Sequence, residues 1–123
     1  MRVAVLTVST LGAAGKREDT SGDLIGEWAR AQGPGAGGQI ARAIVSHDTA
    51  AIARHLIQWA DSGEFNLILT TGGTGLAERD VTPEATRAVI EREAQGIAEY
   101  LRAKAWTSFP RAALSRGIAG VRG

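Results

Sequence analysis

A short run of glycines and threonines is the segment of this sequence best suited to hold a phosphate group. Glycine leaves backbone N–H groups unobstructed, threonine adds hydroxyls, and we expect a helix to begin shortly after the run, so that its N-terminus favours an anion. The glycine spacing matches neither a Walker loop, because no Gly-Lys-Ser or Gly-Lys-Thr follows, nor the dinucleotide-binding fingerprint. The run is equally compatible with a tight turn between a strand and a helix. Its residues are Thr70, Thr71, Gly72, Gly73, Thr74 and Gly75.

Two aspartates lie where they could serve such a phosphate site. Asp80 stands between the glycine run and the helix expected to begin near Thr82, and Asp48 directly follows a neighbouring predicted strand. Carboxylates beside a phosphate are the oxygen ligands that Mg²⁺ uses in phosphoryl and nucleotidyl transfer. Each also has a simpler interpretation: Asp48 as a helix cap, and Asp80 as a surface partner of Arg79. The residues alone leave both interpretations open.

Three apolar runs of strand length are expected to position these loops: Val3–Ser9, Gln39–Val45 and Phe65–Thr71. The first is apolar and β-branched without alternation, as in a strand covered by helices on both faces. Because helical patterns alternate with the strands, the sequence predicts an α/β fold, a three-layer α/β/α sandwich with a mostly parallel central sheet. Such sheets bind ligands beyond the carboxyl ends of their strands, where the glycine run and both aspartates would lie.

Helical patterns with an apolar face follow the first two strands. Asp19 or one of the two hydroxyl residues after it can cap the first helix, and Asp48 can cap the second. We expect both apolar faces to pack on the sheet, with Trp28 and Trp59 in the core. The apolar positions are Leu24, Ile25, Trp28 and Ala29 in the first helix and Ile52, Leu56, Trp59 and Ala60 in the second.

A third helix is predicted to begin at Thr82, because a hydroxyl cap followed by proline and an acid (TPE) is typical of helix starts. Helical spacing continues from there through Val89 and on to Ala105. Between the elements, residues 10–19 are expected to form a loop and residues 33–38 (GPGAGG) a flexible tether. Because the tether precedes a strand, it is not expected to bind phosphate.

The composition describes one ordinary domain. The 123 residues include 14 basic and 13 acidic side chains, with no basic cluster, so a nucleic-acid partner is not expected. No apolar stretch is long enough to span a membrane and the first residues do not resemble a signal peptide, so we expect a cytoplasmic protein. With no cysteine and only two separate histidines, any bound metal is expected to be a hard ion held by oxygen.

The stretch Leu69–Thr86, LTTGGTGLAERDVTPEAT, resembles the signature of the molybdenum cofactor biosynthesis domain found in Mog and MoaB proteins and in gephyrin. These eighteen residues combine the glycine run, an Arg-Asp pair and Thr-Pro-Glu-Ala in an arrangement that is highly specific. Weaker agreement covers nearly the whole chain, through Val8-Ser9, residues 19–22, residues 45–48 and residues 114–116.

The resemblance implies molybdopterin adenylyltransferase activity, in which the terminal phosphate of molybdopterin attacks the α-phosphate of ATP with Mg²⁺ as cofactor. By position, Asp48 and Asp80 match functional acids of the family, as catalytic residues and Mg²⁺ ligands, and residues 70–75 match its substrate-binding loop. The resemblance further implies a homotrimer or hexamer and a molybdate-insertion enzyme that uses the adenylylated product. By position, three further residues match the family's residues at the mouth of the substrate-binding crevice: Ser9, Ser21 and Gly22.

Two features depart from the family pattern. His47-Asp48 stands where the family often has Pro-Asp, and the sequence stops at Gly123, whereas members continue into a strand, a Leu-Pro-Gly-x-Pro loop and a closing helix. If residues 1–123 form the whole domain, we expect a single molybdopterin-binding domain that lacks those elements and leaves a sheet edge open. Binding without turnover, by a MoaB-like carrier, is then the alternative function. Arg116 is expected either to face a phosphate or to form an ion pair.

Overall fold

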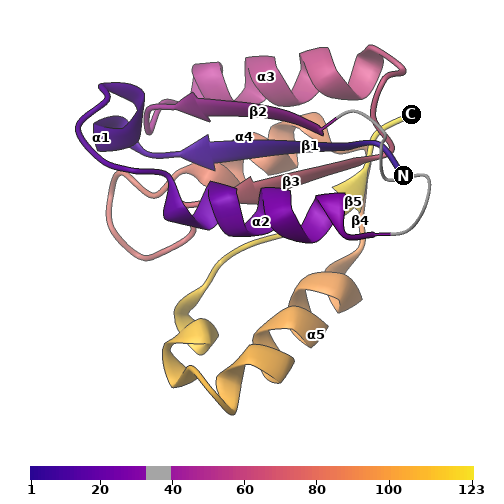
Figure 1. The fold of residues 1–123 in the computed structure, drawn as a ribbon. Helices are drawn as coiled ribbons and strands as arrows, with labels where there is room; N and C mark the ends of the chain where they lie inside the picture. The colour runs from indigo at the N-terminus through magenta and orange to yellow at the C-terminus, as the bar shows by residue number, and fades with distance from the viewer. Residues whose placement is uncertain (33–39) are drawn as a thin grey trace.

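The three predicted strands form one parallel sheet. In the computed structural model, which describes residues 1–32 and 40–123, β1 (Val3–Val8) lies between β2 (Ile40–Val45) and β3 (Leu67–Thr71) (Figure 1). Val3 is aligned with Ile40 on one side and with Leu67 on the other. The carboxyl ends of the strands therefore meet at one edge, as the sequence predicts. The expected tether, residues 33–38, lies outside the described residues.

Helices cover both faces of this sheet. In Figure 1, α2 (Thr20–Arg30) lies on one face, and α3 (Thr49–Asp61) and α4 (Thr82–Val89) lie on the other. All six residues of β1 are buried because alternate side chains serve two cores. Val3 and Val5 pack with Ala29 of α2, whereas Leu6 and Val8 pack with apolar residues of α3 and α4. The predicted α/β/α sandwich is confirmed.

Two aspartates begin helices, as the sequence predicts. Asp19 Oδ1 accepts a hydrogen bond from the Gly22 N–H at 3.0 Å, and Asp48 Oδ2 accepts one from the Ala51 N–H at 3.0 Å. The segment after β1 differs from the expected loop, because it contains a single helical turn, α1 (Thr10–Ala13). The Ser9 hydroxyl oxygen caps this turn by accepting a hydrogen bond from the Gly12 N–H. The two glycines of the segment favour a loop, but this local bond stabilises the helical turn.

The helical spacing predicted from Thr82 to Ala105 is interrupted. α4 ends at Val89, and β4 (Arg92–Glu93) then pairs antiparallel with β5 (Gly120–Val121). Only after this pairing does α5 (Gln95–Trp106) begin, followed by a 3₁₀ helix, η1 (Pro110–Leu114). Local spacing does not reveal the interruption, because the partner strand lies far away in the sequence.

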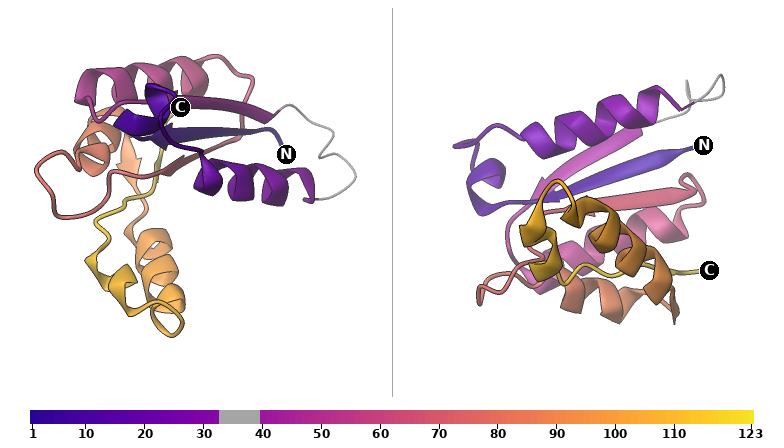
Figure 2. Two further views of the ribbon diagram at one scale, coloured as in Figure 1. Left: turned by 60° about the vertical axis from the view of Figure 1, so that its left-hand side comes forward. Right: turned by 90° about the horizontal axis from the view of Figure 1, so that it is seen from below.

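Apolar residues expected in the core lie partly at the surface. The predictions for Leu24 and Trp28 are wrong, since these residues are 67% and 46% exposed. Small residues of α2 face the sheet instead, because Arg42 of β2 lies against Gly22 and Gly26. Trp59 does pack against the core, as expected. In Figure 2, α5 and η1 project away from the sandwich, and large apolar side chains remain exposed there: Ile97, Tyr100, Leu101, Trp106, Phe109 and Leu114.

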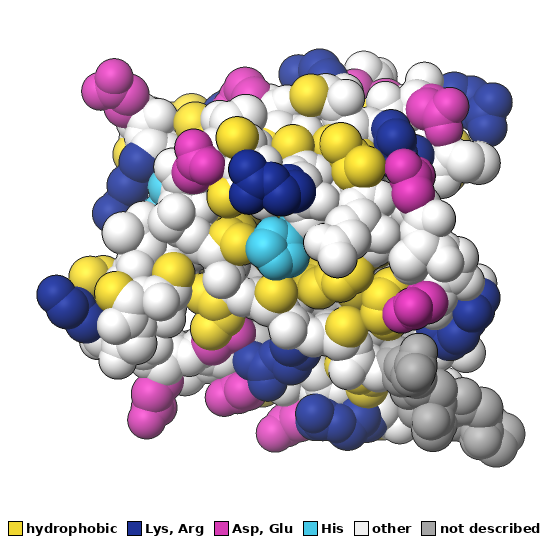
Figure 3. All heavy atoms as spheres, turned by 90° about the horizontal axis from the view of Figure 1, so that it is seen from above, with side chains coloured by type: hydrophobic (Ala, Val, Ile, Leu, Met, Phe, Trp, Pro, Cys, Tyr) yellow, Lys and Arg dark blue, Asp and Glu magenta, His cyan; other side chains and the backbone are white. Residues whose placement is uncertain are grey.

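The outer face above α3 carries charges of both signs. Figure 3 shows lysine or arginine and acidic side chains interspersed around a band of apolar ones on this face. This mixture agrees with the balanced charge of the sequence. Within residues 1–32 and 40–123, no helix is both long enough and apolar enough to cross a membrane.

Candidate functional site

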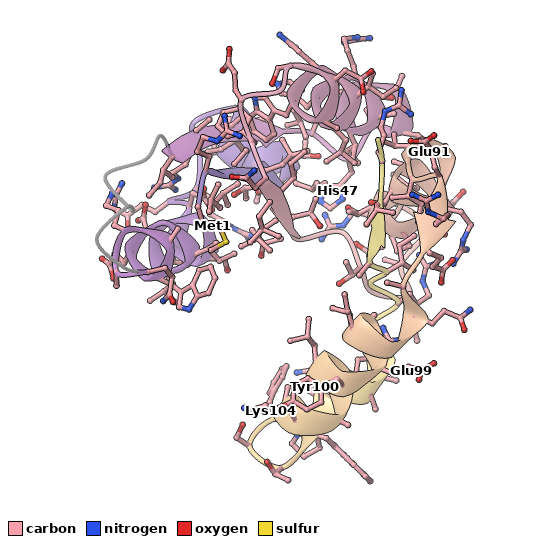
Figure 4. The ribbon with its side chains drawn as sticks, turned by 90° about the vertical axis from the view of Figure 1, so that its right-hand side faces the viewer. Met1, His47, Glu91, Glu99, Tyr100 and Lys104 are labelled. Carbon is pink, nitrogen blue, oxygen red and sulfur yellow. The ribbon has the colours of Figure 1, made fainter. Side chains whose placement is uncertain are left out.

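The loops that follow the strands meet at the carboxyl edge of the sheet, and His47 (labelled in Figure 4) connects them. Its backbone N–H donates to Thr10 Oγ1 at 3.3 Å, and its ring Nδ1 lies 3.1 Å from the carbonyl oxygen of Arg79. Because a carbonyl oxygen can only accept, Nδ1 carries the hydrogen in this contact. His47 and Arg79, which precede Asp48 and Asp80 in the sequence, are therefore in contact.

The glycine run adopts a backbone conformation that glycine accommodates most easily. The φ angle is +94° at Gly72 and +71° at Gly73, and a Cβ at Gly72 would collide with the carbonyl oxygen of Val8. Thr82 holds the run from the other side, because its N–H donates to the Gly73 carbonyl at 3.1 Å and its hydroxyl donates to the Gly72 carbonyl at 2.9 Å. The prediction that this hydroxyl caps α4 is therefore wrong, and Val81 holds the cap position.

A cleft of about 590 Å³ begins at the glycine run and follows β3 toward α5. Its volume lies in the range of small-molecule sites. Away from the glycine run the lining is mostly apolar and includes Leu67 from β3 and Leu101 from α5. The sequence identifies the loop but not these walls, because α5 and residues 115–122 reach the cleft only through the tertiary fold. The polar end is lined by Thr70, Thr71, Gly72, Thr74, Ser115 and Gly117.

Two residues of the predicted loop lie outside the lining of the cleft and pack against other groups of the site. Gly73 lies under Thr82, and a Cβ there would collide with the threonine hydroxyl. A Cβ on Gly75 would come within 2.7 Å of Asp80 Oδ2, so this glycine leaves room for the carboxylate. Both glycines thus shape the loop.

Asp48 and Asp80 each bind a backbone N–H of their own segment. Asp48 caps α3, as in its simpler interpretation, and Asp80 Oδ2 accepts from the Ala77 N–H at 3.0 Å. Within residues 1–32 and 40–123, Asp80 makes no ion pair with Arg79, so its alternative interpretation is not supported. The second oxygen of each carboxylate makes no hydrogen bond to the described residues.

Each of these carboxylates has one oxygen that is not used in its local hydrogen bond and is of the chemical type that Mg²⁺ binds. No cluster of three or more His, Cys, Asp or Glu side chains that could hold a metal ion occurs in the described part of the chain. Mg²⁺ is commonly held by one or two carboxylates, with phosphate oxygens and water completing the octahedron. Asp48 and Asp80 would be the residues that hold it.

The three residues expected at the mouth of the crevice have different roles. The Ser9 N–H donates to the Val45 carbonyl at 2.8 Å, which places Ser9 at the carboxyl edge beside β2. The Gly22 N–H is engaged by Asp19, and a Cβ on Gly22 would collide with that carboxylate, so this glycine serves packing. Ser21 is exposed in the first turn of α2. Among the described residues, no hydrogen bond joins any of the three to the glycine run.

Asp19 is the centre of a hydrogen-bond network. The sequence predicts only its role as a helix cap. Its Oδ2 accepts from the Thr7 hydroxyl at 2.8 Å and from Arg42 Nη2 at 2.8 Å. Burial by itself would raise the pKa of Asp19, but the hydrogen bonds from Thr7, Arg42 and the Gly22 N–H outweigh it and lower the pKa. The network joins β1, β2 and the start of α2, so it fixes the position of α2 beside the crevice.

We expect Asp19→Asn to destabilise the protein at neutral pH by roughly 1–3 kcal/mol, because it weakens a partly buried network. The folded pKa of Asp19 lies below its unfolded value, so its contribution is present above the unfolded pKa and is lost as the pH falls through the folded pKa. Urea unfolding of wild type and variant should therefore give free energies that converge in acid. Asp23→Asn is the control, because Asp23 also pairs with Arg42 but its side chain is 60% exposed. A difference that does not change with pH would contradict the expectation.

Comparison with known proteins identifies the family. The family model described as "Probable molybdopterin binding domain" matches residues 4–121. The molybdenum cofactor synthesis protein cinnamon of Drosophila melanogaster is 41% identical over 123 residues, which cover 97% of this chain and 20% of that protein. A molybdopterin adenylyltransferase of Escherichia coli strain K12 is 32% identical over 122 residues, which cover 99% of this chain and 62% of that enzyme. The chain thus spans less than two thirds of either relative.

Solved structures show the same fold. The molybdopterin biosynthesis enzyme MoaB of Thermus thermophilus is 46% identical with a TM-score of 0.84, and the match covers 99% of this chain and 75% of that one. A MogA structure is 31% identical with a TM-score of 0.91, over 100% of this chain and 78% of that one. The family model covers nearly the whole chain, and relatives of both kinds share its sheet and helices. The chain therefore belongs to the molybdopterin-binding Mog and MoaB family of molybdenum cofactor biosynthesis.

Proposed function

We propose that the protein is a molybdopterin adenylyltransferase. The observation that carries the proposal is the glycine run at the carboxyl edge of the sheet, where a cleft begins at Gly72 and Thr74. Asp48 and Asp80 do not line this cleft, but their segments meet through the His47–Arg79 contact. In this reaction a terminal phosphate oxygen of molybdopterin forms a bond to the α-phosphorus of ATP. The bond from that phosphorus to the bridging oxygen breaks, and pyrophosphate leaves. The products are adenylylated molybdopterin and pyrophosphate.

The chain's own residues would hold the reacting phosphates. Within the glycine run, Thr70, Thr71, Gly72 and Thr74 offer N–H or hydroxyl donors at the polar end of the cleft. Ser9 lies at the same edge of the sheet. Mg²⁺, when bound by Asp48 and Asp80, would offset the negative charge that develops on the phosphate oxygens. The apolar length of the cleft beside β3 would exclude water from the ring system of a bound substrate.

The test is a single-turnover reaction of the purified protein with molybdopterin and MgATP, followed by detection of adenylylated molybdopterin and pyrophosphate. We expect both products in equal amounts. Binding of molybdopterin without product formation would favour the carrier function instead. A protein that binds no molybdopterin would refute both functions.

Asp48→Asn should separate helix capping from catalysis. Asparagine caps helices about as well as aspartate, so the unfolding free energy should change by less than about 0.5 kcal/mol. Loss of the charge should slow adenylyl transfer by about tenfold or more. Asp48→Ala is the companion variant and should also lose about 1 kcal/mol of stability, because the bond to the Ala51 N–H is removed. Equal turnover rates for wild type and Asp48→Asn would leave Asp48 with a capping role only.

We also propose the homotrimer or hexamer that the family resemblance implies, with a molybdate-insertion enzyme as the consumer of the product. The apolar side chains exposed on α5, on η1 and between them, among them Trp106 and Phe109, support self-association because an interface would cover them. In Figure 4, Tyr100 and Lys104 lie on this projecting helix, away from the sheet.

A further inference from the structure

We propose that Arg116 is a positioning residue that fixes the loop joining the glycine run to Asp80, an inference that rests on the proposed function for what the loop binds. Its Nε donates to the Gly75 carbonyl at 2.8 Å, and its Nη2 donates to the Asp80 carbonyl at 2.6 Å. Its backbone N–H donates to the Thr74 carbonyl at 2.8 Å. One residue therefore binds both ends of the loop.

This loop depends on such polar contacts because its tip has little packing. All four residues from 76 to 79 are exposed, and Leu76 is 70% exposed. Within the described residues, the loop is also held by the Asp80 carboxylate bond to the Ala77 N–H, by the Asp80 N–H bond to the Ala77 carbonyl and by the His47 contact to the Arg79 carbonyl. Removing the Arg116 bonds would leave the loop without its attachment to residues 115–117.

Glu84 orients the Arg116 guanidinium from the first turn of α4. Arg116 Nη1 lies 2.8 Å from Glu84 Oε2, and Nη2 lies 3.2 Å from Oε1, which is a forked pairing. The hydrogen bond from Arg116 lowers the pKa of Glu84, so the carboxylate stays charged in mild acid. The planar guanidinium serves two carbonyls and a carboxylate at once, which a lysine ammonium cannot do with the same geometry.

A second arginine supports the backbone on both sides of Arg116. Arg102 Nη1 of α5 donates to the Gly117 carbonyl at 2.7 Å and to the Ser115 carbonyl at 3.4 Å. Ser115 and Gly117 also line the polar end of the cleft, beside the glycine run. Arg116 therefore joins two walls of the same site, residues 115–117 and the loop after β3. If Arg116 formed only a surface ion pair with Glu84, its side chain would not also donate to the Gly75 and Asp80 carbonyls.

The test compares Arg116→Lys with Arg122→Lys by amide hydrogen exchange. Arg122 also lines the cleft but does not contact the loop, and it makes the same kinds of contact: to Asp61 at 3.0 and 3.1 Å and to the Val89 carbonyl at 2.9 Å. We expect exchange of residues 74–81 to rise about tenfold or more in Arg116→Lys and to stay unchanged in Arg122→Lys. Glu84→Gln keeps the Arg116 guanidinium and its bonds to the two carbonyls, so it should raise the exchange rate of residues 74–81 by a smaller factor. This variant provides the test if Arg116→Lys fails to fold.

Molybdopterin affinity and single-turnover adenylylation supply the functional measurements. We expect Arg116→Lys to weaken molybdopterin binding by about tenfold or more, because the loop must be ordered again on binding. Unchanged exchange in residues 74–81 would overturn the inference, whatever reaction the protein catalyses. Faster exchange with unchanged affinity and turnover would overturn the role of Arg116 in the site. If the wild type neither binds nor adenylylates molybdopterin, the proposed function fails, and the exchange measurements still decide whether Arg116 positions the loop.

Discussion

Asp80→Asn is expected to slow adenylyl transfer by about two orders of magnitude or more, which corresponds to roughly 3 kcal/mol of barrier. Negative charge develops on the α-phosphate and pyrophosphate oxygens, and the carboxylate contributes to its stabilisation through the cation that it would hold. Asparagine has nearly the same size, and its side-chain oxygen can still accept the bond from the Ala77 N–H. The substitution therefore removes the charge while the local turn is retained.

Molybdopterin affinity should change by less than about tenfold in the same variant, because a carboxylate repels rather than attracts the substrate phosphate. The measurement is single-turnover product formation, together with molybdopterin binding and a thermal melt to confirm folding. Glu78→Gln is the matched control, because Glu78 is an exposed acid on the same loop. A folded Asp80→Asn protein that turns over at the wild-type rate would show that Asp80 is not catalytic. If wild type and variant both bind without turnover, the carrier function is favoured.

The sheet and its loops could be predicted because their signals are local. The run from Val3 to Val8 is apolar without alternation, and in the structure it is buried on both faces. Asp19 and Asp48 cap helices at the positions where their residue type predicts a cap. Composition alone identifies the glycine run, and the positive φ at Gly72 and Gly73 explains why glycine stands there.

The parts that could not be predicted depend on residues distant in the sequence. The hydroxyl of Thr82 suits a helix cap, but the Gly72 carbonyl lies within reach and accepts its hydrogen bond. The helix expected to continue to Ala105 stops because residues 92–93 pair with residues 120–121. Trp28 is displaced to the surface because Arg42 reaches from β2 toward Asp19 and Asp23 and occupies the space under α2. In each case a tertiary contact overrides a local preference.

Gly72→Ala should have the largest effect of any single methyl group added to this site. The residue has a φ of +94°, where an L-residue is strained by roughly 1–2 kcal/mol. The new Cβ would also collide with the Val8 carbonyl oxygen, which belongs to the central strand and cannot move aside without disturbing the sheet. We expect a loss of at least about 2–3 kcal/mol in unfolding free energy and a loss of molybdopterin binding of tenfold or more.

Gly63→Ala separates the two causes. Gly63 has a φ of +73°, but no atom lies within 4 Å of the position its Cβ would take, so the substitution adds the backbone strain without the collision. It lies between α3 and β3, at the other end of β3 from the glycine run, and should cost only about 1 kcal/mol while molybdopterin binding is retained. Urea unfolding and binding measurements on both variants give the comparison. If Gly72→Ala is no less stable than Gly63→Ala and binds molybdopterin as the wild type does, the close packing of the glycine run on β1 does not determine the shape of the site.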